Sequence, residues 1–469
     1  MNRPTDHPRG QVIVIVAVAF TAILAFLAVL FDGANGMVLR RQMQDAGDAA
    51  AVAAANVIHV GLPRGCSATP GGTPRPSVAQ TARDSLAENL TWFDPNLAAI
   101  SCPAGYDNQA VIVDLSTTAP RFFGGVIGGD LNVSTHSTAI NGQTARSIYS
   151  IVELDPGNPS WPNGRRGCPS VLLSGGPTVV LEGSMQVNSR CTAANGGALS
   201  TNGNAANITM TNGAQIRVTG EYAAGSLTIT PAPVTGVDPI PDPLAALPEM
   251  PVSSMPVRSA TRLVLSNTTQ VLQPGVYQGG LELRNSSVAL LRPGIYVMDG
   301  GGLDIGSQAS FLSVGDGVTA VADWATDCPL GGCGVLIYNT GTTATMDNIA
   351  VGAGATLKLR AYDPNAQADG FSEYEDLLFW QDGDPIPTAT YAQPELSLQG
   401  GGSVDVRGTV YAPSALVRMG GNSGGSGGEA VTLTLQFISW DLEFHGNVSF
   451  HFYFRDNEFA KPMDYGLVE

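Results

Sequence analysis

Two isolated carboxylates have the strongest claim to chemistry in this chain. Asp304 and Asp405 each follow a run of glycines in a segment where polar and apolar residues alternate. A glycosidase needs two carboxylates roughly 5–9.5 Å apart, which these two would supply only by meeting across neighbouring strands. Their places in the alternation instead predict polar positions that face outward. We therefore expect no catalytic pair here.

Two other motifs have the residue types of reactive sites but lack the structural context that such sites require. The acidic turn at residues 382–384 (DGD) has the carboxylates of a calcium-dependent lyase, but the tip of a loop is more typical of solvated charge. Residues 421–425 (GNSGG) fit the GxSxG pattern, yet a nucleophile elbow requires a helix after the turn, and here a strand follows. His445 and His451 are expected to share a strand face, without the partners that complete a metal site. The sequence thus predicts no enzyme, no catalytic residue, no cofactor and no metal site.

Six cysteines lie as neighbours in the sequence: Cys66 and Cys102, Cys168 and Cys191, and Cys328 and Cys333. No second CxxC motif or pair of histidines lies near the last two, so a zinc site is not favoured. Three disulfides are the favoured interpretation, free thiols are the alternative, and the sequence leaves the pairing open. Since disulfides persist outside the reducing cytoplasm, we expect the cysteine-bearing part of the chain there.

The composition favours a turn-rich β protein. Of the 469 residues, 57 are glycine and 31 are proline, and only 13% are charged, against roughly 25% in an average chain. Hydrophobic residues make up 43%, enough for a large core, which excludes a disordered chain. The net charge of -17 repels nucleic acid, so we expect no nucleic-acid partner.

An uncharged apolar segment at residues 11–31 predicts a transmembrane helix after a tail at residues 1–10. About 20 helical residues cross a hydrocarbon core of ~30 Å. A cleaved signal peptide is the alternative, but the apolar run exceeds the roughly 7–15 residues of a typical signal. The short tail can hold no folded domain, and the cysteines favour an oxidising compartment. We therefore expect a single-pass membrane protein with a cytoplasmic N-terminus and an extracytoplasmic bulk, in the periplasm or at the cell surface.

Residues 32–60 predict an extension of this helix, because they are rich in good helix formers. Met43, Ala46, Ala50, Ala53 and Val57 recur at spacings of three and four and form one stripe. Such a small-residue face suits close packing on a partner helix. Packing on the chain's own domain is the equal alternative.

Residues on both sides of the apolar span carry a family pattern. These are Arg9 and Gly10 before it, Asp32 and Gly33 after it, and then Arg41, Gln44, Ala46, Asp48, Ala49 and Ala50. In this pattern the chain resembles TadG-like proteins of the Tad (tight adherence, or Flp) pilus-assembly group. Processed pilins have a glutamate five residues after the glycine of the cleavage site, where this chain has Ile15, so cleavage after Gly10 is not expected. The resemblance implies a membrane-anchored protein whose partners are the membrane and other Tad pilus-assembly proteins, with a small α+β TadE/TadG-like domain at residues 61–146.

From about residue 147 onward, short alternating segments are separated by glycine and asparagine. The sequence PGVY at residues 274–277 recurs as PGIY at residues 293–296. A recurrence near 20 residues is typical of a solenoid, so the sequence predicts a mainly β protein with a right-handed β-helix or solenoid in blocks at 147–230 and 259–469. A β-sandwich or jelly roll is the alternative. The aromatic strands from residue 437 to 454 are expected to cap one end.

Two segments interrupt the alternation. The proline-rich residues 231–258 are expected to form a linker or a strap along the solenoid, since proline is excluded from helix and sheet interiors. Residues 363–395 are expected to be an acidic insertion. Exposed aromatic side chains flanking this insertion could stack on the sugars of a cell-surface glycan, and core packing is the alternative: Tyr362, Tyr374, Phe379, Trp380 and Tyr391.

These observations together predict a membrane-anchored structural component of Tad-like pilus assembly or secretion. The β region would act outside the cytoplasm as a stalk or an adhesive surface. The alternatives are a surface-anchored, carbohydrate-active β-helix enzyme and an independent adhesin that has acquired the same anchor.

Overall fold

A computed structural model describes most of the chain. The described residues are 11–59, 65–69, 71–103, 108–119, 121, 131–143, 149–157, 167–329, 332–341, 346–364, 371–382, 393–400, 403–421, 431–461 and 463–468. The chain divides into two compact units, one formed by residues 1–142 and 464–469 and the other by residues 143–463. The second unit is therefore an insertion in the first, because the chain returns to the first unit only for its last residues.

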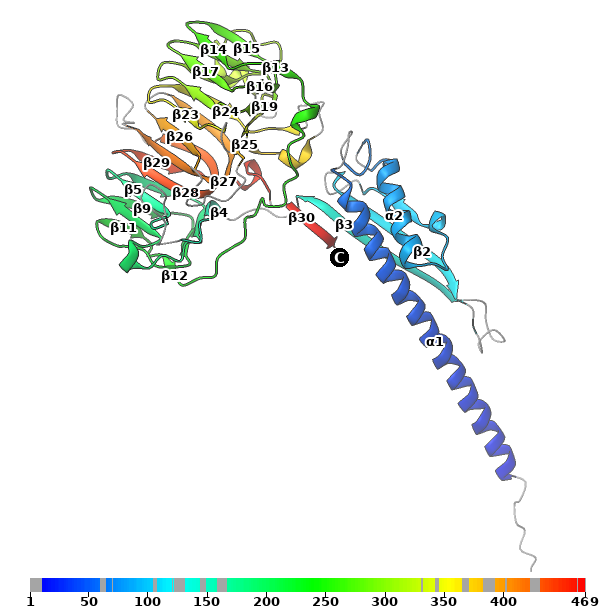
Figure 1. Cartoon of the computed structure of the whole chain (residues 1–469). Helices are drawn as coiled ribbons and strands as arrows, with labels where there is room; N and C mark the ends of the chain where they lie inside the picture. Colours follow the sequence, from blue (N-terminus) through cyan, green and yellow to red (C-terminus); the bar gives the residue numbers. More distant parts are fainter. Residues whose placement is uncertain are drawn as a thin grey trace, which may run out of the picture. The chain divides into compact units, whose positions relative to one another are not determined.

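The first unit begins with one long helix, α1 (Gln11–Asn56), drawn in dark blue in Figure 1. Its 46 residues extend about 69 Å at 1.5 Å per residue, more than twice the hydrocarbon core of a bilayer. Residues Ile13–Asn56 are long and apolar enough to cross a membrane. The large apolar side chains from Ile13 to Phe31 are exposed, so the protein itself does not cover this half of the helix.

The second half of α1 packs into the core of its own unit, against α2 (Pro76–Asn89) and strand β2 (Ala110–Ala119). Met43, Ala46 and Ala50 of the predicted stripe are buried. Beyond them the buried positions are Ala54 and Ile58, one residue later than predicted. Ala51 and Ala55 are buried as well, so the buried face still recurs at spacings of three and four, and only its last two turns are displaced by one residue from the prediction.

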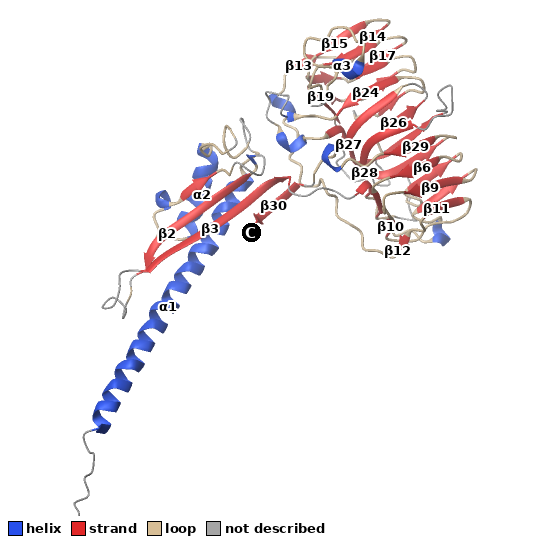
Figure 2. Ribbon diagram, turned by 180° about the vertical axis from the view of Figure 1, so that it is seen from behind, coloured by secondary structure: helices blue, strands red, loops and turns tan. Residues whose placement is uncertain are grey.

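A four-stranded sheet completes the first unit, in the order β1, β2, β3, β30 (Figure 2). Its other strands are β1 (Ala99–Ser101), β3 (Leu131–Gln143) and β30 (Met463–Val468), and a short 3-10 helix, η1 (Pro95–Leu97), precedes β1. Strands β1, β2 and β3 pair antiparallel. Strand β30 comes from the far end of the chain, so the sheet combines segments more than 300 residues apart.

The second unit consists of short strands in one 26-stranded sheet. The first strands are β4 (Tyr149–Glu153), β5 (Val171–Ser174), β6 (Thr178–Leu181), β7 (Ser184–Val187), β8 (Leu199–Asn202), β9 (Ala206–Met210), β10 (Ile216–Val218), β11 (Leu227–Thr230) and β12 (Val234–Thr235). They are followed by β13 (Val257–Ser259), β14 (Leu263–Ser266), β15 (Thr269–Leu272), β16 (Gly275–Gln278), β17 (Leu281–Arg284), β18 (Val288–Leu291), β19 (Gly294–Asp299), β20 (Leu303–Ile305) and β21 (Ser310–Ser313). The last are β22 (Val335–Thr340), β23 (Ile349–Val351), β24 (Thr356–Arg360), β25 (Leu377–Gln381), β26 (Glu395–Gly400), β27 (Val404–Gly421), β28 (Val431–His445) and β29 (Ser449–Phe452). The described helices of this unit are short: η4 (Ala193–Asn195), η5 (Val252–Ser254), α3 (Trp324–Asp327), η7 (Ser372–Tyr374) and η8 (Asp456–Glu458).

These strands pair in parallel, and each strand generally pairs with the strand three positions later in the sequence. We call a series of strands paired in this way a column, three successive strands a level, and the whole arrangement the stack. One column contains β13, β16, β19, β22, β25, β27 and β28, a second contains β14, β17, β20, β23 and β26, and a third contains β15, β18, β21 and β24. The long strand β27 continues all three columns, since it also pairs with β24 and β26. The expected mainly β class with one long N-terminal apolar helix is confirmed, and most of its strands are parallel.

The order of strands in the stack differs from their order in the sequence. Strand β28 pairs with both β4 and β5, and β29 pairs with β6. The first block of strands therefore continues the stack from the end of the second block, and the stack runs from β13–β15 to β10–β12 (Figure 1). Strands β28 and β29 lie inside this stack, so the prediction that residues 437–454 form a cap is wrong.

Corners between strands use backbone conformations that favour glycine and asparagine. Asn267 and Asn285 turn two successive corners with φ of 52° and 54°. Gly280 has φ of 78°, and a Cβ there would lie 2.1 Å from the carbonyl oxygen of Gly302. Glycine is thus required where one corner stacks directly on the next.

The proline-rich segment lies along the column that contains β7, β27 and β25. Asn188 donates to the carbonyl oxygen of Ile240 at 2.7 Å, and the Tyr411 hydroxyl donates to Asp242 at 2.8 Å. Farther along, the Tyr374 hydroxyl lies 3.0 Å from the carbonyl oxygen of Pro248. The segment is therefore in contact with strands that span most of the stack, and we call residues 236–256 the strap.

Strand β25 lies within the segment that the sequence presents as an acidic insertion, residues 363–395. It pairs with β22 and β27, and all five of its residues are buried. The expected single insertion is therefore wrong: a core strand divides it, because the acids lie before and after an apolar LLFW run that the core requires.

Candidate functional site

One residue of the family pattern, Gln44, joins helix α1 to strand β3 by hydrogen bonds. The Gln44 amide donates to Asp48 at 2.7 Å and to the Ser137 hydroxyl at 3.1 Å. A Cβ added at Gly47 would lie 2.8 Å from that hydroxyl oxygen, so glycine permits the close approach of helix and strand. The pattern thus includes a residue that holds helix α1 on the sheet of its own unit.

The remaining pattern residues are distributed over the same helix. Ala46 and Ala50 are buried in the core, while Asp48 and Ala49 are half-buried. Gly33 and Arg41 are exposed and Asp32 is half-buried. Arg9 and Gly10 lie outside the described residues.

All six cysteines form disulfides, each between sequence neighbours: Cys66–Cys102, Cys168–Cys191 and Cys328–Cys333. The first crosslinks the end of the α1 region to the start of the sheet in the first unit. The other two lie in the second unit. The expectation of disulfides is confirmed, and the structure supplies the pairing that the sequence leaves open.

The two carboxylates considered for catalysis are not brought together. Asp304 is exposed on β20, in the second column, where it stands in register with Glu282 and Ala350. Asp405 lies in the third column, where it stands beside Lys358. They belong to different columns and to levels of the stack that are not adjacent.

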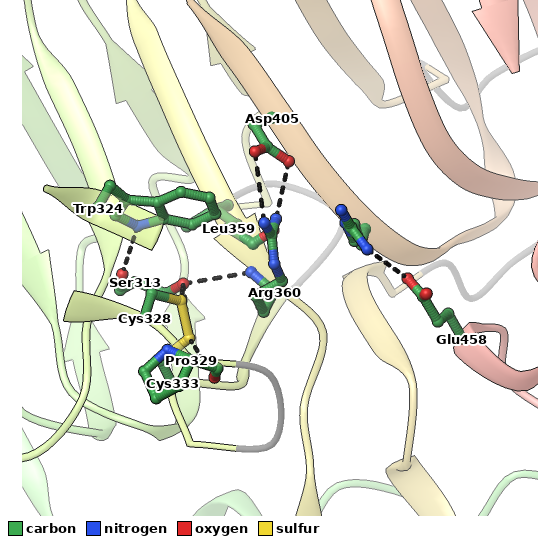
Figure 3. Close-up of polar contacts among 10 residues, drawn as sticks. Ser313, Trp324, Cys328, Pro329, Cys333, Leu359, Arg360, Asp405 and Glu458 are labelled. Carbon is green, nitrogen blue, oxygen red and sulfur yellow. Dashed lines mark hydrogen bonds and ion pairs between the residues drawn. A yellow bond between two sulfur atoms is a disulfide. The ribbon is translucent and has the colours of Figure 1, made fainter. Parts of the chain in front are cut away.

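Asp405 instead forms a bidentate ion pair with Arg360, at 2.9 and 3.3 Å (Figure 3). The guanidinium of Arg360 also lies 4.2 Å from the ring centre of Trp324. The indole nitrogen of Trp324 donates to the carbonyl oxygen of Ser313 at 2.8 Å. Asp405 therefore ends a structural chain of contacts that begins at β21, and it also lines a pocket of about 380 Å³ with Arg407, among others.

Most of the other predicted positions are not accessible for binding. Tyr362, Tyr374 and Phe379 are fully buried, and Trp380 is 7% exposed. The expected exposed aromatic surface is wrong for these four residues. Tyr362, Tyr374 and Trp380 pack in one cluster with the strap, and Phe379 packs in the main core of the second unit. Tyr391, most of the 382–384 turn and most of the 421–425 motif lie outside the described residues.

The two histidines do not share a strand. His445 ends β28, and its ring fills the space that a Cβ at Gly420 would need. His451 lies on β29, 3.4 Å from Glu182 and stacked on Tyr453 with ring centres 4.3 Å apart. A corner separates the two strands, which the even spacing in the sequence does not reveal.

A cluster that sequence reasoning missed lies at the junction of β4 and β28. Oxygens of Glu153, Asp155 and Asp441 lie within 4.8 Å of one another, and all three residues are buried. Glu153 is the last residue of β4, Asp155 follows it, and Asp441 lies on β28 in the neighbouring level of the stack. This is the group in the described part of the chain that could hold a metal ion.

Burial dominates the electrostatics of this cluster. It raises the pKa of Glu153 well above the usual value, and the nearby charges of Asp155 and Asp441 raise it further. Burial also raises the pKa of Asp155, to about 7. The sequence offers no signal for the cluster, because Asp441 is 286 residues from Asp155 and each acid alone resembles a solvated strand end.

A comparison with protein families finds a match over the N-terminal part of the chain. Residues 10–57 match the Tad family, described as Flp pilus-assembly TadE/G-like. The match covers about a tenth of the chain and includes the exposed half of α1 and the part that packs on β3. No curated protein and no solved structure matches the chain.

Proposed function

The N-terminal segment of this chain is a TadE/G-like segment of the Flp pilus-assembly family, and from this premise we propose that the protein is a membrane-anchored structural component of a Tad/Flp pilus or secretion apparatus. The observation that carries the proposal is the coincidence of the family segment with α1. The same 46-residue helix supplies an exposed apolar half and a half that belongs to a folded domain. Its partners would be the membrane and other Tad pilus-assembly proteins.

The rest of the chain would lie outside the cytoplasm, with the N-terminal tail inside. Three disulfides support this orientation, since they persist in oxidising compartments. All of them lie on the C-terminal side of the apolar half of α1.

The second unit would be a right-handed β-helix that serves as a stalk or an adhesive surface. Parallel pairing with a period of three supports a β-helix, because each level of three strands then covers the preceding one. A non-enzymatic role is supported by the separation of Asp304 and Asp405 and by the ion pair that occupies Asp405.

The anchor can be tested by placing charge on the exposed half of α1. Leu24 and Leu27 are 50% and 41% exposed, and we expect the double substitution Leu24→Arg, Leu27→Arg to move the chain out of the membrane fraction and to abolish piliation. Leu24→Val, Leu27→Val is the matched control and should retain both. Wild-type numbers of pili on cells that lack the protein would refute the assembly role, and membrane retention of the arginine variant would refute the anchor.

A further inference from the structure

The buried cluster of Glu153, Asp155 and Asp441 lies where two distant parts of the chain meet. Ser439 of β28 stands in register with Glu153 of β4, and the backbone N–H of Asp155 donates to the carbonyl oxygen of Trp440. The cluster therefore joins the first block of strands to the last strands of the second block.

Hydrogen-bond donors orient each carboxylate through one of its oxygens. Glu153 accepts from the backbone N–H of Asn188 at 3.0 Å, and Asp155 accepts from the backbone N–H of Gly157 at 2.8 Å. Asp441 accepts from the Gln393 amide at 2.9 Å. Donors that hold one oxygen of a carboxylate while the other binds are typical of metal ligands.

The opposite oxygens of two of these carboxylates have no such donor. Glu153 Oε1 and Asp155 Oδ2 are buried without a hydrogen-bond partner among the described residues. An independent observation points in the same direction: the Ser439 hydroxyl is also fully buried and has no partner there. Since residues in register on parallel strands present their side chains to the same face, that hydroxyl lies on the same side of the sheet as Glu153.

Buried negative charge of this density requires compensation. An isolated carboxylate in a protein interior is strongly destabilised, so it is either protonated or paired with a cation. The charged groups that act on Glu153 through space are Asp155 and Asp441, which are both acidic. Three converging carboxylates, together with the buried oxygens of Glu153 and Ser439 that have no hydrogen-bond partner among the described residues, match the preference of a hard cation for oxygen ligands.

We propose that Glu153, Asp155 and Asp441 bind one Ca²⁺ ion, with the Ser439 hydroxyl at the edge of the site. A Ca–O distance of roughly 2.3–2.6 Å places oxygens on opposite sides of a Ca²⁺ ion about 5 Å apart. The oxygens of this cluster lie within 4.8 Å of one another, so one ion can contact all three residues. Mg²⁺ fits less well, since it retains water and the site is buried. The ion would fasten β4 to β28 and so stabilise the continuation of the stack across this junction.

Calcium binding to the full-length protein in detergent micelles tests the proposal. After equilibration with 1 mM CaCl₂ and gel filtration, elemental analysis should find about one calcium per chain. EDTA should lower the melting temperature by several degrees, because a ligand that binds only the folded state stabilises it by mass action. Glu153→Gln and Asp155→Asn should each weaken calcium binding at least tenfold. In EDTA, these variants should melt at or above the temperature of the parent protein, because each removes like-charge repulsion.

Asp304→Asn is the matched control, since it removes an exposed carboxylate of the same unit and should leave calcium binding unchanged. A parent protein that binds no calcium and melts at the same temperature in EDTA and in calcium would overturn the proposal. So would a calcium response that survives in the Glu153→Gln, Asp155→Asn double variant, because the ion would then bind elsewhere.

Discussion

Asp376 is a half-buried carboxylate at a turn that three parts of the second unit share. Its backbone has φ of 63°, its N–H donates to the carbonyl oxygen of Tyr362, and its own carbonyl oxygen accepts from Thr409. Burial raises the pKa of Asp376 to about 7, and the neighbouring charge of Glu375 raises it as well, whereas Lys461 opposes the shift. Asp376 thus adopts the backbone conformation that the turn requires, although burial makes its ionised carboxylate unfavourable.

The raised pKa of Asp376 predicts that the free energy of unfolding depends on pH. Because the folded-state pKa lies above the unfolded value near 4, the stabilisation from the bound proton is complete below about pH 4 and is lost as the pH rises to about 7. Asp376→Asn keeps a side chain that tolerates positive φ but cannot ionise. We expect the variant to exceed the parent by roughly 1–3 kcal/mol in free energy of unfolding at pH 8 and to equal it near pH 4.

Urea denaturation followed by tryptophan fluorescence would measure this difference, with Asp304→Asn as an exposed control that shows none. An equal gain at both pH values would mean that the asparagine acts through packing and not through charge.

Two of the arginine ion pairs in the second unit predict a contrast at the same scale. Arg360, 13% exposed, pairs with Asp405 and stacks on Trp324, whereas Arg284, 58% exposed, pairs with Glu282 on the surface. Arg360→Met should lower the free energy of unfolding by about 1–3 kcal/mol, since it removes both contacts and leaves a carboxylate without its partner. Arg284→Met should leave the free energy of unfolding nearly unchanged, because solvent screens an exposed pair. Equal effects in denaturant titrations would show that burial does not decide the contribution of these pairs.

At the scale of elements, the strap explains why so many aromatic residues of the second unit are buried. Leu244 and Met250 insert into a cluster with Trp380 and Tyr411 on the outer face of one strand column. The ring centres of Trp380 and Tyr411 lie 5.8 Å apart beneath it. The strap therefore serves as a second layer over a surface that would otherwise be a large apolar patch.

Leu244→Ala should cause local opening of the strap without unfolding the strands of the second unit. Leu244 is 1% exposed, and loss of a buried leucine costs about 2–5 kcal/mol, which is enough to favour local opening of a segment outside the strand ladder. We expect amide hydrogen exchange over residues 236–256 to accelerate at least tenfold, while β22 and β25 remain protected. Val264→Ala, at a side chain 42% exposed on β14, is the control and should leave the strap unchanged. Faster exchange in the strands themselves would show that strap and stack unfold together.

At the scale of the whole molecule, the sequence predicts elements better than their partners. The apolar helix and the alternating strands follow from periodicity, which is a local property. The burial of Trp380 depends on where a proline-rich segment 130 residues away comes to lie, and the alternation around Trp380 is the same in either case. The acid cluster was not predicted for the same reason: no local sequence pattern near Glu153 or Asp441 indicates that β4 pairs with β28.

The return of the chain to its first unit predicts the effect of a truncation. A chain ending at Lys461 would lack β30 and leave β3 as an unpaired edge in a three-stranded sheet. We expect the first unit to melt at a lower temperature and to self-associate, while the second unit melts as before, because β30 is not part of its sheet. Calorimetry with two resolved transitions would measure this, and Leu467→Ser, at a half-exposed position of β30, is the mild control. An unchanged transition of the first unit would show that β30 contributes nothing to it.

The position of β30 also sets an order of events during synthesis. The ribosome makes α1 and the first three strands of the small sheet, then the whole second unit, and only then the strand that completes the sheet. At roughly 5–20 residues per second, the first unit waits about 16–64 s for its last strand. A chain that terminates early anywhere in the second unit therefore leaves the sheet of the first unit with an open edge, so that a completed four-stranded sheet reports that the whole second unit has been made.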